Sequence, residues 1–311
     1  VPMGQIRAKG GIVYSRNVCG WSGRVPMLLR RVCALVAGVG IAVAGVGLAP
    51  PAIAQVRSEY EGNVDPNYVW RSDAASKLLA GKPWTDYVLH RVPGSFHDAP
   101  RIPEASNQAL TRGNSLYGPS TPIYVKRTNG TESMCTVAVA GHDDKGHKYA
   151  LTAGHCGEVG DAVTSADSWQ VGPSGTIVEV NRDLDYALIE LGSNAEVTRS
   201  YNGVHINHLG SKPIKPGNVV CKQGVASCRT CGVTLHDWES MNISHTCAMQ
   251  GDSGAPVVVG DRLVGILNGG VLPSPFDVSC HSPLQGVIHA PTGAVRMDAV
   301  LSTLDNGFRL P

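Results

Sequence analysis

The stretch Gln250-Gly251-Asp252-Ser253-Gly254-Ala255-Pro256 places one hydroxyl group between residues that can bend the backbone sharply. Gly251 and Gly254 can adopt dihedral angles that a side chain would penalise, so the chain can turn tightly around Ser253 and direct successive N–H groups at one point. An oxyanion would fit at that point. Because a serine hydroxyl alone is a weak nucleophile, such chemistry also requires a base and a carboxylate that orients the base.

A candidate base lies upstream, in Thr152-Ala153-Gly154-His155-Cys156 at the end of an apolar segment. An imidazole titrates near neutral pH and can accept the serine proton and return it to a leaving group. A candidate carboxylate is Asp185, after which an apolar segment begins immediately. At the start of a strand it would be partly buried, where it can hold the imidazole N–H. Asp183, two residues earlier, is the competing candidate.

The composition favours a turn-rich β protein. Charged residues make up 16% of the chain, and there are 37 Gly and 20 Pro among 311 residues. The formal net charge is +1, so nothing in it indicates a nucleic-acid partner. From residue 123 onward, short apolar segments alternate with turn signals. We expect strands at 123–127, 135–140, 148–152, 175–180, 186–191, 203–208, 219–222, 232–235, 256–259, 262–267 and 286–289.

The chain ends with Met297, Val300, Leu301 and Leu304, which are spaced for one face of a helix. A turn at Pro291-Thr292-Gly293 is expected before it. We therefore predict an all-β body with one C-terminal helix, and we assign residues 121–311 to it.

The first 54 residues have the pattern of a signal peptide. Arginines precede an apolar segment at 32–48, and Ala52-Ile53-Ala54 has the form of a cleavage site. Residues 1–26 are interpreted as a start-site artefact. The alternative is a retained membrane anchor, since the apolar segment is only slightly short for a span. Secretion after removal of 1–54 is the expectation, with membrane contact only if the segment is retained.

Residues 55–120 are interrupted by prolines and are sparse in apolar residues. One short helix is expected near 72–79. The rest is interpreted as a prosegment or an N-terminal extension, and a disordered linker remains an alternative.

Nine cysteines are present, and two of them, Cys19 and Cys33, fall in the predicted leader. The other seven cysteines are an odd number, so at most three disulfides form among them and one thiol is left over. Cysteine usage of this kind is typical of an oxidising compartment.

The three motifs Thr-Ala-Gly-His-Cys, Asp-Tyr-Ala-Leu and Gly-Asp-Ser-Gly, in that order, closely resemble those of the chymotrypsin-like serine proteases. The body resembles their short secreted bacterial form, the streptogrisin and α-lytic group. The resemblance implies two antiparallel six-stranded β-barrels with the site between them. It also implies that Ser253 is the nucleophile, His155 the general base and then acid, and Asp185 the residue that orients His155, with the N–H groups of Gly251 and Ser253 as the oxyanion hole.

The same resemblance implies which cysteines pair and which residues bind substrate. Cys228 would be left unpaired, and a zinc or redox role for Cys228-Arg229-Thr230-Cys231 is the minor alternative. Gly269 and Gly270 would pair with the backbone of an extended peptide. His245 would lie at the floor of the specificity pocket, where it favours an acidic side chain or fills a shallow pocket. The implied disulfides are Cys135–Cys156, Cys221–Cys231 and Cys247–Cys280.

The chain departs from the family pattern at several positions. Asn268 stands where a serine is usual near the buried aspartate, and Ala255 replaces a glycine. In many members a freed amino terminus pairs with the aspartate that corresponds to Asp252. No cleavage signal for this occurs around Thr121-Pro122-Ile123, and Arg229 and Arg262 are candidate internal cations.

These patterns predict a secreted serine endopeptidase that forms an acyl-enzyme on a peptide or protein substrate. The alternative is a protease-like binding or regulatory protein whose site is latent. No cofactor or metal is implied. The sequence indicates neither the natural substrate nor the oligomeric state.

Overall fold

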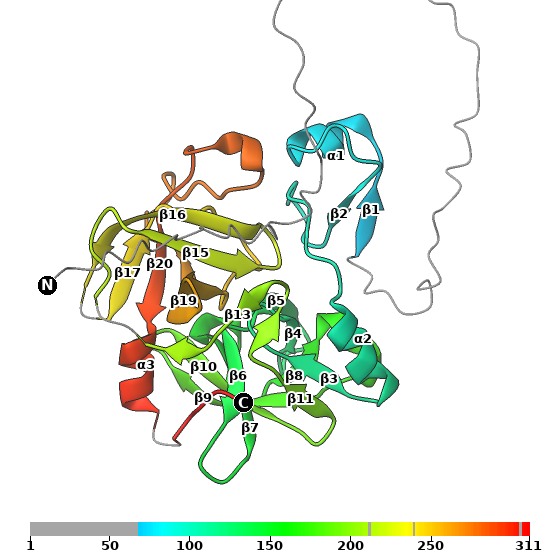
Figure 1. Ribbon diagram of the computed structural model, residues 1–311, viewed down its shortest axis with the longest axis vertical. Coiled ribbons are helices and arrows are strands. Elements are labelled where there is room, and N and C mark those ends of the chain that lie inside the picture. Colours follow the sequence, from blue (N-terminus) through cyan, green and yellow to red (C-terminus); the bar gives the residue numbers. More distant parts are fainter. Residues whose placement is uncertain (1–67, 211–212, 239, 305–306) are drawn as a thin grey trace, which may run out of the picture. The chain divides into compact units, whose positions relative to one another are not determined.

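The computed structural model describes residues 68–210, 213–238, 240–304 and 307–311, so the predicted signal peptide lies outside the described residues. Within these ranges most elements are strands (Figure 1). No helix there is both long enough and apolar enough to span a membrane.

The first sheet has seven antiparallel strands in the order β5-β4-β8-β9-β10-β7-β6. Its two edges belong to one bent segment, because β5 ends at Thr136 and β6 begins at Val139. The N–H of Val137 donates to Thr121 on one side, and that of Ala138 donates to Leu151 on the other. The sheet thus curls into a barrel, although no ladder joins the edge strands. The strands are β4 (Pro122–Lys126), β5 (Glu132–Thr136), β6 (Val139–His142), β7 (Lys148–Ala153), β8 (Ala162–Ser165), β9 (Gly175–Asn181) and β10 (Tyr186–Leu191).

The second sheet closes on itself through six antiparallel strands, because β19 pairs with both β18 and β20. The short strand β14 (His208–Leu209) joins β19 in parallel. Two six-stranded antiparallel barrels were expected. The second sheet forms one of them, and the first sheet forms the other only in part. The strands are β15 (Val219–Gly224), β16 (Cys228–Asp237), β17 (Met241–Ser244), β18 (Pro256–Val259), β19 (Arg262–Gly270) and β20 (Thr292–Arg296).

An apolar core joins the two sheets. Leu151 and Leu188 of the first sheet pack in one buried cluster with Ile266 of the second. Met297 and Val300 of helix α3 (Met297–Thr303) extend this cluster, as the predicted C-terminal helix requires. Because side chains of both sheets share one close-packed interior, the loops at the junction hold fixed positions.

The segment before the first sheet is more structured than its sequence suggests. The expected helix is present as α1 (Ala74–Leu79), capped by the side chain of Asp73. The other elements here were not predicted, because each is short and lacks a periodic apolar pattern. They are β1 (Val69–Arg71), β2 (Val88–His90), α2 (Glu104–Thr111) and β3 (Ser115–Tyr117), which pairs in parallel with β11 (Ala195–Val197).

Three expectations within the second half were wrong. Residues 286–289 form a turn after the 3-10 helix η3 (Pro283–Gln285), since Val287 and Ile288 are exposed and pair with no strand. Residues 203–208 contain only β13 (Val204–His205), which pairs with β12 (Ser200–Tyr201), and the first residue of β14. The predicted turn at 291–293 overlaps β20, whose small residues gave no strand signal.

The extension meets the second barrel through a buried imidazole. His97 is 5% exposed, and its Nε2 lies 3.1 Å from the carbonyl oxygen of Cys280. Burial, together with the nearby charge of Lys222, lowers the pKa of His97 from 6.5 to about 4. The charges of Asp252 and His281 act on the same ring with opposite signs.

This pKa shift predicts how stability depends on pH. The unfolded chain takes up the His97 proton near pH 6.5, whereas the folded chain takes it up near pH 4. The unfolded state therefore binds more protons between these values, and His97 should cost up to about 3 kcal/mol of stability as the pH falls through this window. Urea unfolding with the disulfides intact, at pH 7 and pH 4.5, measures the effect. The variant His97→Gln should lose less stability than the natural protein, and an equal loss would contradict the prediction.

Candidate active site

The geometry of the site begins with the pairing of β7 and β10. Ala153, the last residue of β7, lies opposite Tyr186, the first residue of β10. His155 follows β7 in the 3-10 turn η1 (Gly154–Cys156), and Asp185 precedes β10. A Cβ atom on residue 154 would lie 3.0 Å from the backbone of Asp185, so glycine there permits the close approach.

His155 is held by Asp185 through three contacts. The Nδ1 atom of His155 lies 2.9 Å from Oδ2 and 3.1 Å from Oδ1 of Asp185, and the backbone N–H of His155 donates to Oδ1 at 2.8 Å. Asp185 adopts φ = 52°, in the left-handed region that few non-glycine residues occupy. The competing candidate, Asp183, is exposed.

The pKa of the Asp185 carboxyl is lowered, which favours its ionised form. Burial alone would raise the pKa of its carboxyl, but hydrogen bonds from His155 and Asn268, with the charge of the imidazolium, lower the pKa overall. A carboxylate kept charged beside Nδ1 fixes the tautomer in which Nε2 is free to accept a proton.

Ser253 comes from the second barrel and completes the hydrogen-bonded series. Its Oγ lies 2.8 Å from Nε2 of His155. Ser253 lies in the loop 245–255 between β17 and β18, here called the serine loop. This loop is tied to both barrels, since Thr136 N–H donates to Ser253 O at 2.8 Å and Gly254 N–H donates to Leu267 O at 2.7 Å. Gly254 has φ = 85°, and a Cβ atom there would lie 2.1 Å from Thr152 Oγ1. This crossing point therefore requires glycine.

The arrangement can perform nucleophilic catalysis. His155 can take the Ser253 proton while Asp185 stabilises the imidazolium. Among the described residues, no group accepts a hydrogen bond from the N–H of Gly251 or Ser253, the two donors expected for an oxyanion. Gly251 adopts φ = 97°, and its carbonyl accepts from Thr136 Oγ1 at 2.8 Å, which anchors the turn.

Asn268 bonds Asp185 twice. Its Nδ2 donates to Asp185 Oδ2 at 2.8 Å and to the Asp185 carbonyl at 2.9 Å. Its Oδ1 accepts from the N–H of Val295 on β20 at 2.7 Å. The amide that departs from the family pattern thus supplies two donors where a serine hydroxyl would supply one.

Asp252 is fully buried and is paired with Lys222. The Nζ of Lys222 lies 2.9 Å from Oδ2, and both side chains are inaccessible to solvent. The N–H groups of Ala226 and Ser227 donate to Oδ1 at 2.9 and 3.1 Å, and the Ser227 hydroxyl donates to Oδ2. Burial would raise the pKa of Asp252, but these partners, with Lys222 foremost, hold it below its ordinary value.

The expectation that Arg229 or Arg262 neutralises Asp252 was wrong. Lys222 takes that place, because it lies on the inward face of β15 with the buried Val220. A signal was available in the sequence: alternation along the strand places residues 220 and 222 on one face, so a lysine there points into the barrel.

The proposed peptide-binding residues lie on the free part of β19. Gly269 and Gly270 pair with β20 on one side, whereas β18 reaches only Ile266 on the other. No strand pairs there among the described residues. A Cβ atom on Gly270 would lie 3.8 Å from Ala290.

His245 does not stand alone. Its ring stacks on that of His289 with 4.3 Å between centroids and 11° between planes. Its Nε2 contacts the carbonyl of His289 at 3.3 Å, and both rings are partly buried. His289 was assigned no role from the sequence. Burial lowers its pKa, and the charges of His245 and Lys222 act in the same direction.

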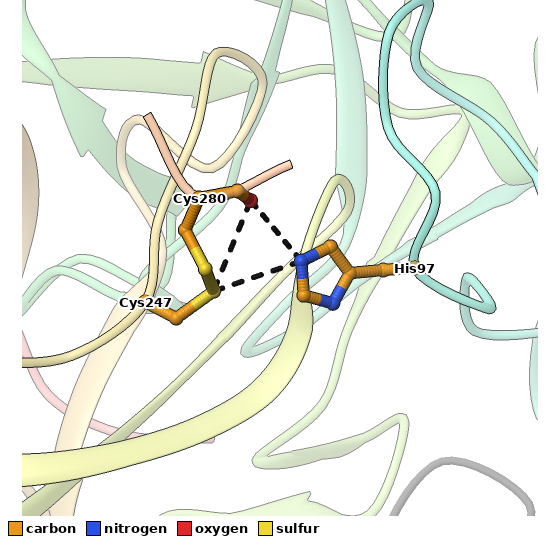
Figure 2. Close-up of side chains that lie close together, drawn as sticks. All are labelled: His97, Cys247 and Cys280. Carbon is orange, nitrogen blue, oxygen red and sulfur yellow. Dashed lines mark hydrogen bonds between the residues drawn. A yellow bond between two sulfur atoms is a disulfide. The ribbon is translucent and has the colours of Figure 1, made fainter. Parts of the chain in front are cut away.

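Three disulfides join Cys135 to Cys156, Cys221 to Cys231 and Cys247 to Cys280, the pairs that the resemblance implied. The thiol of Cys228 is buried. Figure 2 shows His97 beside the Cys247–Cys280 disulfide, where the three ligand atoms lie within 4.8 Å of one another. A cysteine binds a metal ion through its thiolate. The disulfide removes them, so this cluster does not fit a metal, and Cys231 is likewise unavailable to a zinc site with Cys228.

No protein-family model matches the chain. Two relatives are known from Mycobacterium tuberculosis, Uncharacterized protein MT1863 of strain CDC 1551 / Oshkosh and Uncharacterized protein Rv1815 of strain ATCC 25618 / H37Rv. Each is 35% identical to the chain over 184 residues, which cover 51% of this chain and 78% of the relative.

Similar solved structures are bacterial proteases. Thermobifida fusca Protease A is 22% identical, with a TM-score of 0.49, and Nocardiopsis Protease is 21% identical, with a TM-score of 0.48. Each match covers 63% of this chain and 100% of the other.

The two sheets carry His155 and Asp185 on the first and Ser253 on the second, with the serine loop tied to both. The chain therefore has a chymotrypsin-like serine protease fold, and it belongs to the same family as the two Mycobacterium tuberculosis proteins.

Proposed function

We propose that the protein is a secreted serine endopeptidase that cleaves peptide bonds through an acyl-enzyme. The observation that carries this proposal is the hydrogen-bonded series from Asp185 through His155 to Ser253 Oγ. The ion pair of Lys222 and Asp252 adds support, because it supplies an internal cation without a freed amino terminus. Three disulfides suit an oxidising compartment.

The reaction would proceed in two halves. Ser253 Oγ attacks the peptide carbonyl carbon while His155 Nε2 takes the hydroxyl proton, and the carbonyl oxygen becomes an oxyanion near the N–H groups of Gly251 and Ser253. The tetrahedral intermediate collapses as His155 gives its proton to the leaving amine. Water, deprotonated by His155, then attacks the ester, and Ser253 recovers its proton when the acid is released.

An extended peptide would bind along β19. The free side of Gly269 and Gly270 allows the substrate backbone to add as an antiparallel strand. The nucleophile and the Asn268 that supports Asp185 adjoin this stretch, so the scissile bond would be placed by backbone hydrogen bonds.

Replacing the nucleophile tests the proposal directly. Ser253→Ala should reduce peptide hydrolysis by several powers of ten and abolish labelling by a fluorophosphonate probe, because no other hydroxyl of the described residues is paired with His155. The control is Ser302→Ala, on the exposed face of α3, which should leave both unchanged. If the natural protein labels no faster than the heat-denatured protein, the proposal fails and a latent binding or regulatory protein is favoured.

Asn268 should support catalysis through Asp185. Asn268→Leu removes the amide that donates to Asp185 Oδ2 and to the Asp185 carbonyl, although Oδ2 keeps its contact with His155 Nδ1. A lost hydrogen bond of this kind costs about 1 to 3 kcal/mol, so kcat should fall about 5- to 150-fold with little change in KM. Asn268→Ser keeps a hydroxyl donor and should retain more activity. Steady-state kinetics on one peptide substrate measure both variants. An unchanged kcat for Asn268→Leu would show that the amide does not position Asp185.

We also propose that the stacked rings of His245 and His289 lie at the specificity pocket and favour an acidic side chain before the cut. An imidazole N–H can donate a hydrogen bond to a carboxylate, whereas a phenyl ring cannot. A peptide library read with the natural protein and with His245→Phe, which keeps a flat ring, tests the proposal, and the variant should lose the preference. A dominant Arg preference would contradict the assignment of the pocket.

A further inference from the structure

Residues 88–99 form a strap across the second barrel. It begins in β2, and its buried residues include both apolar and polar side chains. Arg91 anchors it to the first barrel, where its guanidinium lies 2.5 Å from Asp167 and both side chains are inaccessible to solvent. Tyr201 donates to the same carboxylate at 2.5 Å. A buried ion pair leaves a costly unpaired charge when one partner departs, so this anchor resists release of the strap.

Beyond the anchor, the strap bonds the loop 225–228. The hydroxyl of Ser95 donates to the carbonyl of Ala226 at 2.6 Å, and the thiol of Cys228 donates to the carbonyl of Asp98 at 2.7 Å. Ser95 and Cys228 are 4% and 5% exposed. Cys228 adopts φ = 56°, so the loop is held in a conformation that a cysteine rarely adopts without such contacts.

The loop 225–228 is the same loop that holds Asp252. The peptide groups of this loop face both ways: the Ala226 N–H donates to Asp252, and the Ala226 carbonyl accepts from Ser95. The carbonyl of Cys228 accepts from Lys222 Nζ at 3.1 Å. The strap thus contacts the outer side of the loop that pairs with Lys222 and Asp252 on its inner side.

Two further contacts bring the strap to the serine loop itself. A Cβ atom on Gly251 would lie 3.1 Å from Cγ2 of Val92, so Val92 packs on the residue that carries an expected oxyanion donor. His97 contacts the Cys247–Cys280 disulfide, which anchors the start of the serine loop (Figure 2).

We propose that the strap is a permanent part of the working enzyme and that Ser95 is a positioning residue. Ser95 braces the loop 225–228, which bonds Asp252, and so keeps the N–H groups of Gly251 and Ser253 in place. This inference rests on the proposed peptidase function. It assigns the extension a supporting role, in contrast to an inhibitory prosegment that must be removed. Loss of the brace would let the loop 225–228 relax and admit water to the Lys222–Asp252 pair. Because the electrostatic attraction in this pair is strong only while the pair is buried, water would weaken it.

Point variants of the full chain test the brace. Ser95→Ala removes the hydroxyl and leaves the Ala226 carbonyl without its buried partner. The rate of fluorophosphonate labelling and kcat should each fall about 10-fold with little change in KM, because the oxyanion contact is made in the transition state. The matched control is Ser282→Ala, which removes another hydroxyl that bonds the extension. The Ser282 Oγ donates to the carbonyl of Leu79 at 2.5 Å and accepts from the N–H of Leu284, and both partners lie outside the loop 225–228. This control should leave both rates unchanged.

Hydrogen exchange provides a readout that does not depend on activity. The N–H groups of Ala226 and Ser227 should exchange faster in Ser95→Ala than in Ser282→Ala. Val92→Ala, which only trims the contact with Gly251, serves as a milder variant if Ser95→Ala does not fold, and it should lower the labelling rate in the same direction.

The outcomes separate the two proposals. If the natural protein does not label, the peptidase proposal fails, while faster exchange in Ser95→Ala still supports the brace. Equal exchange and labelling in Ser95→Ala, Val92→Ala and Ser282→Ala would overturn the brace. Faster labelling in the strap variants would overturn it in favour of an inhibitory segment.

Discussion

The buried pair of Lys222 and Asp252 is the interaction on which the site depends. Removing two charges from water is costly, and the cost is met only if every remaining donor and acceptor finds a partner. Here the Ala226 and Ser227 N–H groups and the Ser227 hydroxyl complete the shell of Asp252. Because Asp252 lies between Gly251 and Ser253, satisfying its carboxylate also fixes the turn that carries Ser253, the proposed nucleophile.

A second constraint is the junction of the two barrels. Neither sheet contains the whole site: His155 and Asp185 follow from the pairing of β7 with β10, and Ser253 arrives from the other barrel. The shared core of Leu151, Leu188 and Ile266 packs the two sheets against each other. Asn268 links Asp185 of the first barrel to Val295 of the second. Stability and the geometry of the proposed site thus rest on the same interface.

The extension changes how this architecture is understood. Its prolines and sparse apolar residues suggested an irregular segment, yet it contributes Arg91, Ser95 and His97 to buried contacts with both barrels. Polar side chains that bond backbone carbonyls leave no periodic pattern in the sequence, so a segment held in this way is easily taken for an irregular one. The start of β20 was missed for a different reason: Thr292, Gly293 and Ala294 are small and give no strand signal, so a turn was predicted at 291–293.

The sequence by itself determined the local features whose cause lies within a few residues: the glycines that permit the serine turn, the apolar strands such as β10, the capped helix α1 and the C-terminal helix. It also named His155, Asp185 and Ser253, because their motifs are local. Only the tertiary structure decided which cation meets Asp252, how Asn268 bonds Asp185, that His289 stacks on His245, and where the extension lies. These depend on residues far apart in the chain that meet only when the two sheets and the extension pack together. Alternation along a strand can indicate that a side chain points inward, as for Lys222, but not which distant residue it meets there.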